Sequence, residues 1–383
     1  MSTQMKRIMV LVMALAVVFS GCGKKIAQPI SVMETPEYHY KQGLRYLDKD
    51  QNADAMKEFE RAIALDPKSP LGYIGKGLSL GRKGDYKPAL ENMSKAKGLD
   101  KGIEAHIGMI RLYSMQREKG WLAEAEDEFK SAQKKDADSP PLHYYMGMAY
   151  KVAFDFDKAA ERFRKVIDLN KDYTGEANAE WAVIQKIQRA APGTEIGKKI
   201  ALIDKIDRAD IAALFDQEMN IEKLFTKRGV KNYDTSFKAP TESSTKMTTE
   251  TTTKIEPASD ITDHWLKPSM DLVLKLQIRG LEAGPDHKFD PDKLLTKGEF
   301  ALMLEDILIK VSGDEKMATK FLGTTSPFPD VRNDHYAFNA IMMATSRGYL
   351  EADKATGEFK ALDPVSGADA LLSIREFKNQ LKF

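Results

Sequence analysis

"EYHYKQGLRYLDKDQNADAMKEFERAIALDP", residues 37–67, places small and bulky apolar residues at the spacing of two short helices. Gly43, Ala55 and Ala62 are the small residues, and Phe59 is the bulky one. Small residues let two antiparallel helices approach closely, and a bulky ring can then fill the space against the next pair. The stretch therefore predicts a helical hairpin that stacks on another hairpin.

The same pattern returns along the chain with a period near 34 residues, which is typical of a stacked repeat architecture. Ala55 is echoed by Ala89, Ala125 and Ala159, Phe59 by Met93, Phe129 and Phe163, and Ala62 by Ala96, Ala132 and Val166. The middle copies are weaker, because Pro88 lies in the first turn of a second helix and Tyr113 replaces a glycine. We predict four hairpins and an all-α fold.

These spacings resemble the tetratricopeptide repeat (TPR), best in the first copy and in the fourth, residues 142–170. The resemblance implies a helical solenoid over residues 36–190, closed by a capping helix from Thr174 to Arg189. It also implies a concave groove for a protein partner, lined by Tyr40, Leu44, Ile74, Leu78, Ile110, Ser114, Tyr144 and Met148. Most of these side chains are apolar, so we expect an extended or helical peptide there. The alternative is that they pack within the superhelix.

A second repeat, with a period near 70, begins at Ile261. It pairs His264 with His335, Phe289 with Phe359, Thr296 with Ser366, and Glu299 with Asp369. A hydroxyl followed three residues later by an acid is the spacing of a capping box, which opens a helix. Each unit therefore predicts a helix, a glycine-containing loop, a turn and a second helix.

These residues resemble the S-layer homology (SLH) motif, most closely in "HKFDPDKLLTKGEFALML", residues 287–304. "GEFKALDPVSGADALL", 357–372, is a degenerate copy, and "IDRADIAALF", 206–215, matches half of one. The resemblance implies a mostly helical, pseudo-threefold module with a partial repeat at 191–237 and two repeats at 261–383.

The SLH resemblance also implies binding of cell-wall polysaccharide or peptidoglycan through an arginine that opens the second helix. The corresponding positions here are Arg208, Lys297 and Gly367. Lysine keeps the charge without the forked donor geometry of arginine, and glycine keeps neither. Two alternatives stay open, namely that the module only folds or that it binds a protein.

"TDHWLKP" (262–268) and "NDHYAFN" (333–339) place an acid, an imidazole and an aromatic ring side by side. A metal site or acid–base pair would need further ligands, but the six histidines are scattered and no HExxH motif occurs. We therefore expect each motif to start a helix, with Trp265 and Tyr336 burying a large face. The sequence predicts no metal, no cofactor and no enzymatic activity.

The N-terminus reads "MKRIMVLVMALAVVFSGCGKK", residues 5–25, which is the layout of a secretory signal. Its last residues before Cys22 resemble a bacterial lipoprotein box, which implies a signal peptide over 1–21, lipidation of Cys22 and a polar tether over 22–35. The alternative is an ordinary cleaved signal. Since Cys22 is the only cysteine, an intramolecular disulfide is excluded.

Residues 238–260 form the other segment of unusual composition, with nine Ser or Thr among residues 241–253. Such a stretch cannot bury a core, so we predict a disordered insertion within the SLH-like region. The net charge of +1 supplies no field that would attract nucleic acid.

The leading hypothesis is a membrane-anchored lipoprotein of the cell envelope that holds another envelope protein in its TPR groove and touches the wall. Gly23 after the lipidated cysteine favours the outer membrane, facing the periplasm. The alternative is an assembly factor for outer-membrane, pilus or secretion components, in which the SLH-like region is only structural. A glycan hydrolase would need two carboxylates about 5–10 Å apart in a cleft, and no motif singles out such a pair.

Overall fold

The computed structural model describes residues 26–99, 102–228 and 258–381. They are helical, with no strand among the described residues and only two isolated β-bridges. The chain divides into two compact units, one ending at Trp181 and the other beginning at Ala182. The all-α prediction is confirmed.

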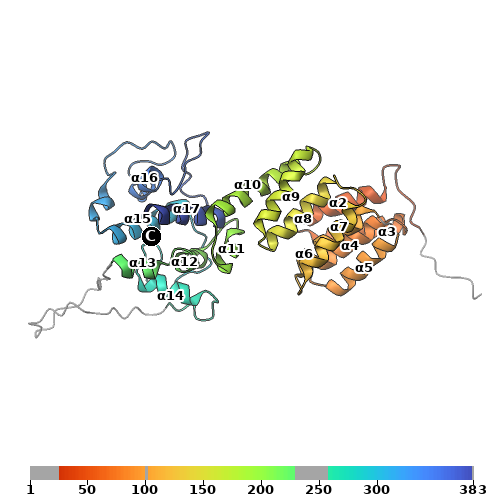
Figure 1. Cartoon of the computed structure of the whole chain (residues 1–383), viewed down its shortest axis with the longest axis horizontal. Helices are drawn as coiled ribbons and strands as arrows, with labels where there is room; N and C mark the ends of the chain where they lie inside the picture. The colour runs from red at the N-terminus through yellow and green to blue at the C-terminus, as the bar shows by residue number, and fades with distance from the viewer. Residues whose placement is uncertain (1–25, 100–101, 229–257, 382–383) are drawn as a thin grey trace, which may run out of the picture. The chain divides into compact units, whose positions relative to one another are not determined.

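Unit 1 is built from antiparallel helix pairs (Figure 1). They are α2 (Pro36–Asp48) with α3 (Asn52–Leu65), α4 (Pro70–Arg82) with α5 (Tyr86–Leu99), α6 (Ile103–Gln116) with α7 (Trp121–Gln133), and α8 (Pro140–Val152) with α9 (Phe156–Leu169). The first helix of each pair packs on the first helix of the next, as in a solenoid. A longer helix, α10 (Thr174–Ala190), follows at the position of the predicted capping helix.

The alternation of small and bulky residues explains this packing. The ring of Phe59 is fully buried between Gly43 and Gly75, where an added Cβ would lie 2.3 and 2.0 Å from ring atoms. In the fourth pair, a Cβ on Gly147 would lie 2.7 Å from the ring of Phe163. The glycines are therefore required by the closeness of the two helices to the ring, not by their backbone conformation.

Residues 26–35 lie against α3. The Ala27 N–H donates to the Ala64 carbonyl over 2.7 Å, and the Arg61 guanidinium donates to the Gln28 carbonyl over 3.1 Å. The described part of the predicted tether is therefore packed on the solenoid instead of hanging free.

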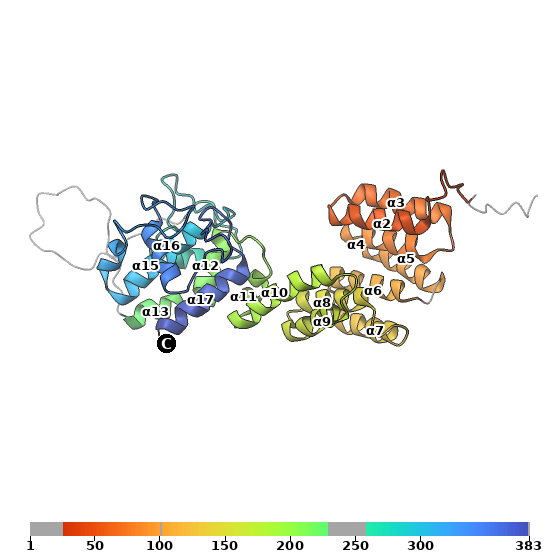
Figure 2. The same cartoon turned by 90° about the horizontal axis from the view of Figure 1, so that it is seen from above.

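Unit 2 is built from helices of very different length, several of which are labelled in Figure 2. They are α11 (Glu195–Ala201), α12 (Arg208–Gln217), α13 (Ile221–Arg228), α14 (Lys267–Lys275), α15 (Lys297–Ser312), the 3₁₀ helix η1 (Glu315–Thr319), α16 (Phe338–Ser346) and α17 (Gly367–Leu381). Helix α14 packs on α12, α16 on α15, and α11 on α17. Each short helix thus covers the long helix of another copy, and the third contact closes a circle.

A ring of three backbone hydrogen bonds marks the centre of this circle. The Ile206 N–H donates to Val365 O over 2.9 Å, the Leu295 N–H to Ile206 O over 2.9 Å, and the Val365 N–H to Leu295 O over 3.0 Å. Each of these residues lies two positions before the first residue of α12, α15 or α17. The pseudo-threefold arrangement expected from the sequence is therefore present in the backbone.

The first copy, predicted as a half repeat without a front, has a helix before α12. Its front helix is α11, which is only seven residues long and is followed by a short loop instead of the glycine-containing loop of the other copies. Thr296 and Glu299 form the predicted capping box, and the Ser366 Oγ accepts the Asp369 N–H over 3.1 Å at the other predicted position. Asp207 and Asp210, which the sequence analysis did not single out, form a further capping box.

Two carboxylates that the sequence analysis did not single out hold the long loops of the other copies. Asp260 accepts the Phe289 and Asp290 N–H groups, each over 2.8 Å. Asp330 accepts the Phe359 N–H over 2.8 Å and the Lys360 N–H over 2.6 Å. Burial raises the pKa of both carboxyls, but the backbone donors outweigh it, so both pKa values are lowered.

An acid sensitivity of unit 2 follows from these lowered pKa values. Each carboxylate adds stability that is present above the unfolded value, about 3.9, and is lost as the pH falls through the folded-state pKa. An Asp330→Asn variant should lose about 1 kcal/mol at pH 7, because the amide nitrogen cannot accept and solvent screens the exposed Asp330 side chain. Its stability should also change less than that of the wild type between about pH 5 and pH 2.

Chemical denaturation at several pH values, followed by circular dichroism, measures this difference. Asp334→Asn is the matched control, since the ion-pair partner of Asp334 among the described residues is the exposed Arg332. Equal pH dependence of the Asp330→Asn variant and the wild type would contradict the role given to the carboxylate.

Candidate binding sites

The predicted concave row of unit 1 contains both buried and accessible residues. Ile74, Leu78 and Ile110 are fully buried in the solenoid core. They are therefore not available to a partner in this structure. Their burial agrees with the alternative, in which these side chains pack within the superhelix. The partly exposed members of the row are Tyr40, Leu44, Ser114, Tyr144 and Met148.

An aromatic cluster gathers around Tyr144. Its ring stacks on that of Tyr173, with centroids 5.0 Å apart, and meets Tyr145 edge-on at 5.2 Å. The Arg111 guanidinium lies 4.4 Å from the centroid of the Tyr145 ring, within the range of a cation–π contact. Tyr173 has a left-handed φ of 65°, which is uncommon for a bulky residue.

Tyr40, from the first helix pair, belongs to the same neighbourhood. Burial raises its pKa to about 12, and the charges that act on it come from Arg111, Tyr145 and Glu104. Burial likewise raises the pKa of Tyr144 to about 12. These hydroxyls stay protonated at neutral pH, so the concave face offers aromatic surface, hydroxyl groups and one arginine. The repeat pattern did not reveal Arg111, Tyr145 or Tyr173, because it marks helix contacts and not this surface.

Arg208, at the first predicted glycan-binding position, is occupied by contacts with the backbone. It donates to the Phe289 carbonyl over 2.7 Å, to the Glu282 carbonyl over 2.9 Å, and to the Gly280 carbonyl. Its guanidinium lies 4.7 Å from the centre of the Phe289 ring, and burial lowers its pKa. Arg208 therefore links two of the repeated segments of unit 2 and has few donors left for a ligand.

Lys297 makes the corresponding link in the next copy. Its Nζ donates to the Phe359 carbonyl over 2.7 Å and to the Glu351 carbonyl over 3.1 Å, and lies 4.5 Å from the Phe359 ring centre. It also lines a pocket of about 710 Å³ in unit 2. Lys186, Arg189 and Lys354 bring three more positive charges to this pocket, and Glu351, Asp369 and Glu376 bring three negative ones.

Gly367 stands at the third position that corresponds to the SLH arginine, and the space for a side chain there is filled by α11. A Cβ at this residue would lie 1.7 Å from the carbonyl oxygen of Ile200, which belongs to α11, and the Gly367 N–H donates to Ile203 O over 2.9 Å. Arg208 and Lys297 each reach toward a long loop of the next copy. At Gly367 the loop of the facing first copy is short, so α11 occupies the space that a side chain at position 367 would need. Only glycine fits there.

The sequence prediction for Trp265 and Tyr336 was wrong. They were expected to start helices and to be buried, but α14 begins at Lys267 and α16 at Phe338, and the two rings are 64% and 63% exposed. The histidine of each motif has a local role, since the His264 Nδ1 accepts the Leu266 N–H and the His335 Nδ1 accepts the Ala337 N–H. This turn directs each aromatic ring outward.

Within the described ranges, no cluster of three or more His, Cys, Asp or Glu side chains could hold a metal ion. None of the helices described is long and apolar enough to span a membrane. The predicted lipidation site, Cys22, the signal peptide over 1–21 and the Thr/Ser-rich residues 238–257 lie outside the described residues.

Comparison with known families agrees with the two resemblances. The tetratricopeptide repeat family matches residues 36–69, and the S-layer homology domain family matches residues 327–371. Among solved structures, a thermophilic TPR protein from Thermus thermophilus is 19% identical, and the match covers 50% of this chain and 96% of that one with a TM-score of 0.35. No curated protein matches the chain. The TPR repeat indicates a scaffold for protein interaction, and the SLH domain indicates association with the cell envelope.

Proposed function

We propose that this chain is a non-catalytic scaffold of the cell envelope that binds a wall polysaccharide through unit 2 and a protein through the concave face of unit 1. In this proposal a lipid on Cys22 holds it to a membrane, the outer one facing the periplasm. Peptidoglycan or a polymer linked to it is the glycan, and an envelope protein is the other partner. No cofactor takes part.

The pocket beside Lys297 is the observation that carries the proposal. Lys186 is paired with Asp369 over 2.7 Å and Lys354 with Glu351 over 3.1 Å. In the part of the chain that the structure describes, neither Arg189 nor Lys297 has a carboxylate within ion-pair distance. Arg189 can therefore meet the carboxylate or phosphate groups of a wall polymer, and Lys297 can do so with the one N–H that its two carbonyl acceptors leave.

Tyr336 supplies the second element of a glycan site. Its hydroxyl lies 3.7 Å from where a Cβ on Gly298 would be, so the exposed ring is next to the residue that follows Lys297. A flat, exposed ring offers apolar contact area with a hydroxyl at its edge. A sugar ring on Tyr336 would place its acidic substituents near Lys297.

For the protein partner, the accessible part of the concave row is Tyr144 and Met148 with Tyr40 and Leu44. Tyrosine supplies contact area and a hydrogen-bonding hydroxyl, and methionine adapts to irregular partners. These properties suit a peptide held mainly by apolar contacts.

Retention on purified sacculi tests the glycan half of the proposal. The wild-type chain should sediment with sacculi, whereas Arg189→Glu and Tyr336→Ala should each weaken retention by about three- to tenfold, the equivalent of about 0.7–1.4 kcal/mol. Both side chains are exposed, so neither substitution should disturb the fold.

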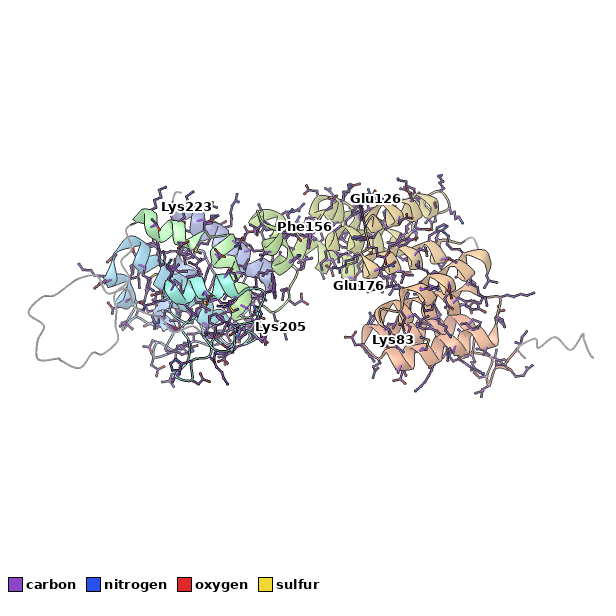
Figure 3. The ribbon with its side chains drawn as sticks, turned by 90° about the horizontal axis from the view of Figure 1, so that it is seen from below. Lys83, Glu126, Phe156, Glu176, Lys205 and Lys223 are labelled. Carbon is purple, nitrogen blue, oxygen red and sulfur yellow. The ribbon has the colours of Figure 1, made fainter. Side chains whose placement is uncertain are left out.

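The matched control is Lys205→Glu, which makes the same charge change at an exposed site outside the pocket, labelled in Figure 3. If the wild type is retained no better than an unrelated lipoprotein, glycan binding is ruled out and the assembly-factor alternative remains. Equal losses for Lys205→Glu and Arg189→Glu would mean that retention depends on overall charge and not on the pocket.

A further inference from the structure

The segment before α2 has an unusual surface. Val32 and Met33 are 100% and 81% exposed, and Ile30 is 90% exposed. Three neighbouring apolar side chains that are almost fully exposed are unusual on a folded surface. Burying such a side chain would contribute about 25 cal/mol of favourable free energy per Å² of apolar surface removed from water.

A polar network holds the base of this loop in place. The Glu34 N–H donates to the Ser31 carbonyl over 3.1 Å, closing the turn that carries Val32 and Met33. The Glu34 carboxylate accepts from Arg61 Nε over 2.7 Å and lies 3.1 Å from His39 Nε2. Hydrogen bonding by Arg61 is the main reason that the pKa of Glu34 falls to about 2, so the Glu34 carboxylate at the foot of the loop stays charged at neutral pH.

The loop is therefore attached to α2 and α3 by charged groups, while its apolar tip faces outward. A chain that only linked an anchor to a domain would need neither the network nor the three apolar residues. Ile26, which is 62% exposed, extends the apolar surface toward the N-terminus.

The position of the loop in the sequence indicates what covers it. Ile26 is four residues from Cys22, and an extended chain spans at most about 3.6 Å per residue. A lipid on Cys22 would hold Ile26 within about 15 Å of the bilayer surface. Lys24 and Lys25, between the two, carry charges that favour anionic headgroups.

We propose that the tip of this loop, Ile30, Val32 and Met33, inserts into the membrane interface and seats unit 1 on the bilayer. The occupant is a phospholipid surface, and the inference rests on the proposed anchor at Cys22. Interfacial apolar groups of this kind reach about 5–10 Å into the boundary between headgroups and acyl chains. The lipid would then set not only the location of the solenoid but also which of its sides faces the membrane.

The test uses the mature full-length protein inserted by its own lipid into vesicles of phosphatidylethanolamine and phosphatidylglycerol. The lipid is attached through the sulfur of Cys22 as a thioether, so a Val32→Cys variant has a single free thiol for a polarity-sensitive fluorophore. Lys83→Cys is the matched control, because Lys83 is an exposed residue after the end of α4 (Figure 3). On vesicles, the label at position 32 should shift to shorter wavelength and be quenched by lipid-borne nitroxide, several-fold more strongly than the label at position 83.

The outcomes separate the loop from the anchor. If the wild-type chain itself takes up a thiol reagent, the anchor at Cys22 is overturned. If the wild type has no free thiol and positions 32 and 83 respond alike, the loop does not enter the membrane and this inference fails alone. Protection of position 32 that grows with protein density and is insensitive to lipid quencher would assign the loop to a second copy of the chain, which also overturns it.

Discussion

A Gly367→Ala variant is expected to lose about 3 kcal/mol or more of the stability of unit 2, a change of over a hundredfold in the folding equilibrium. The added Cβ would lie 1.7 Å from the Ile200 carbonyl oxygen, and backbone cannot rotate away as a side chain can. Helix α11 must move off α17, which also strains the hydrogen bond from the Gly367 N–H to Ile203 O.

Hydrogen exchange resolved by peptide is the measurement, because it reports each unit separately. Peptides from α11 and α17 should exchange faster in the variant, while those from α2 to α9 should not change. Gly193→Ala is the matched control in the same unit, since its Cβ would lie at an ordinary 3.8 Å from Glu218 Oε2. Normal protection of α11 in Gly367→Ala would show that the close approach is relieved without cost.

A Tyr144→Asp variant is expected to abolish capture of the protein partner, with a loss of about thirtyfold or more, as for a central interface residue. The substitution removes the ring that stacks on Tyr173 and adds a negative charge near Glu180 and Glu176, whose charges already act on this position. A photo-crosslinking residue at position 148, used in whole cells, would measure the captured fraction.

Two comparisons make this result specific. Tyr144→Phe keeps the ring and should retain capture, and Tyr38→Asp makes the same change at a half-exposed site in the first turn of α2. Leu78→Asp is not informative about binding, because Leu78 is fully buried and a charge there would damage the fold itself. Undiminished crosslinking by a folded Tyr144→Asp protein would remove the concave face as the site.

The solenoid could be predicted because the contacts that define it are local in the sequence. Ala55, Phe59 and Ala62 make contacts within one hairpin or with the next, so their spacing repeats along the sequence and the same contacts recur in the structure. By contrast, the sequence could not distinguish Ile74 and Leu78, which are core residues, from Tyr144, which is accessible. All lie on first helices, and only the packing of neighbouring pairs decides which of them meets solvent.

Unit 2 was harder to predict because its contacts join distant segments. Gly367 looked like a degraded arginine position until α11 was found in the space that the side chain would need. Helix α11 itself was missed because seven residues hold too few turns for a clear apolar period. Trp265 and Tyr336 were placed inside because large rings favour burial, but the turn at the preceding histidine directs them outward.

The hydrogen-bonded ring at the centre of unit 2 has a consequence for biosynthesis. The Ile206 N–H finds its acceptor in Val365, 159 residues later, so the ring can close only after the last copy has been made. At about 5–20 residues per second, a ribosome needs roughly 10–30 s to make the intervening chain. Folding of unit 2 around its ring is therefore completed only after its last helix has been synthesised.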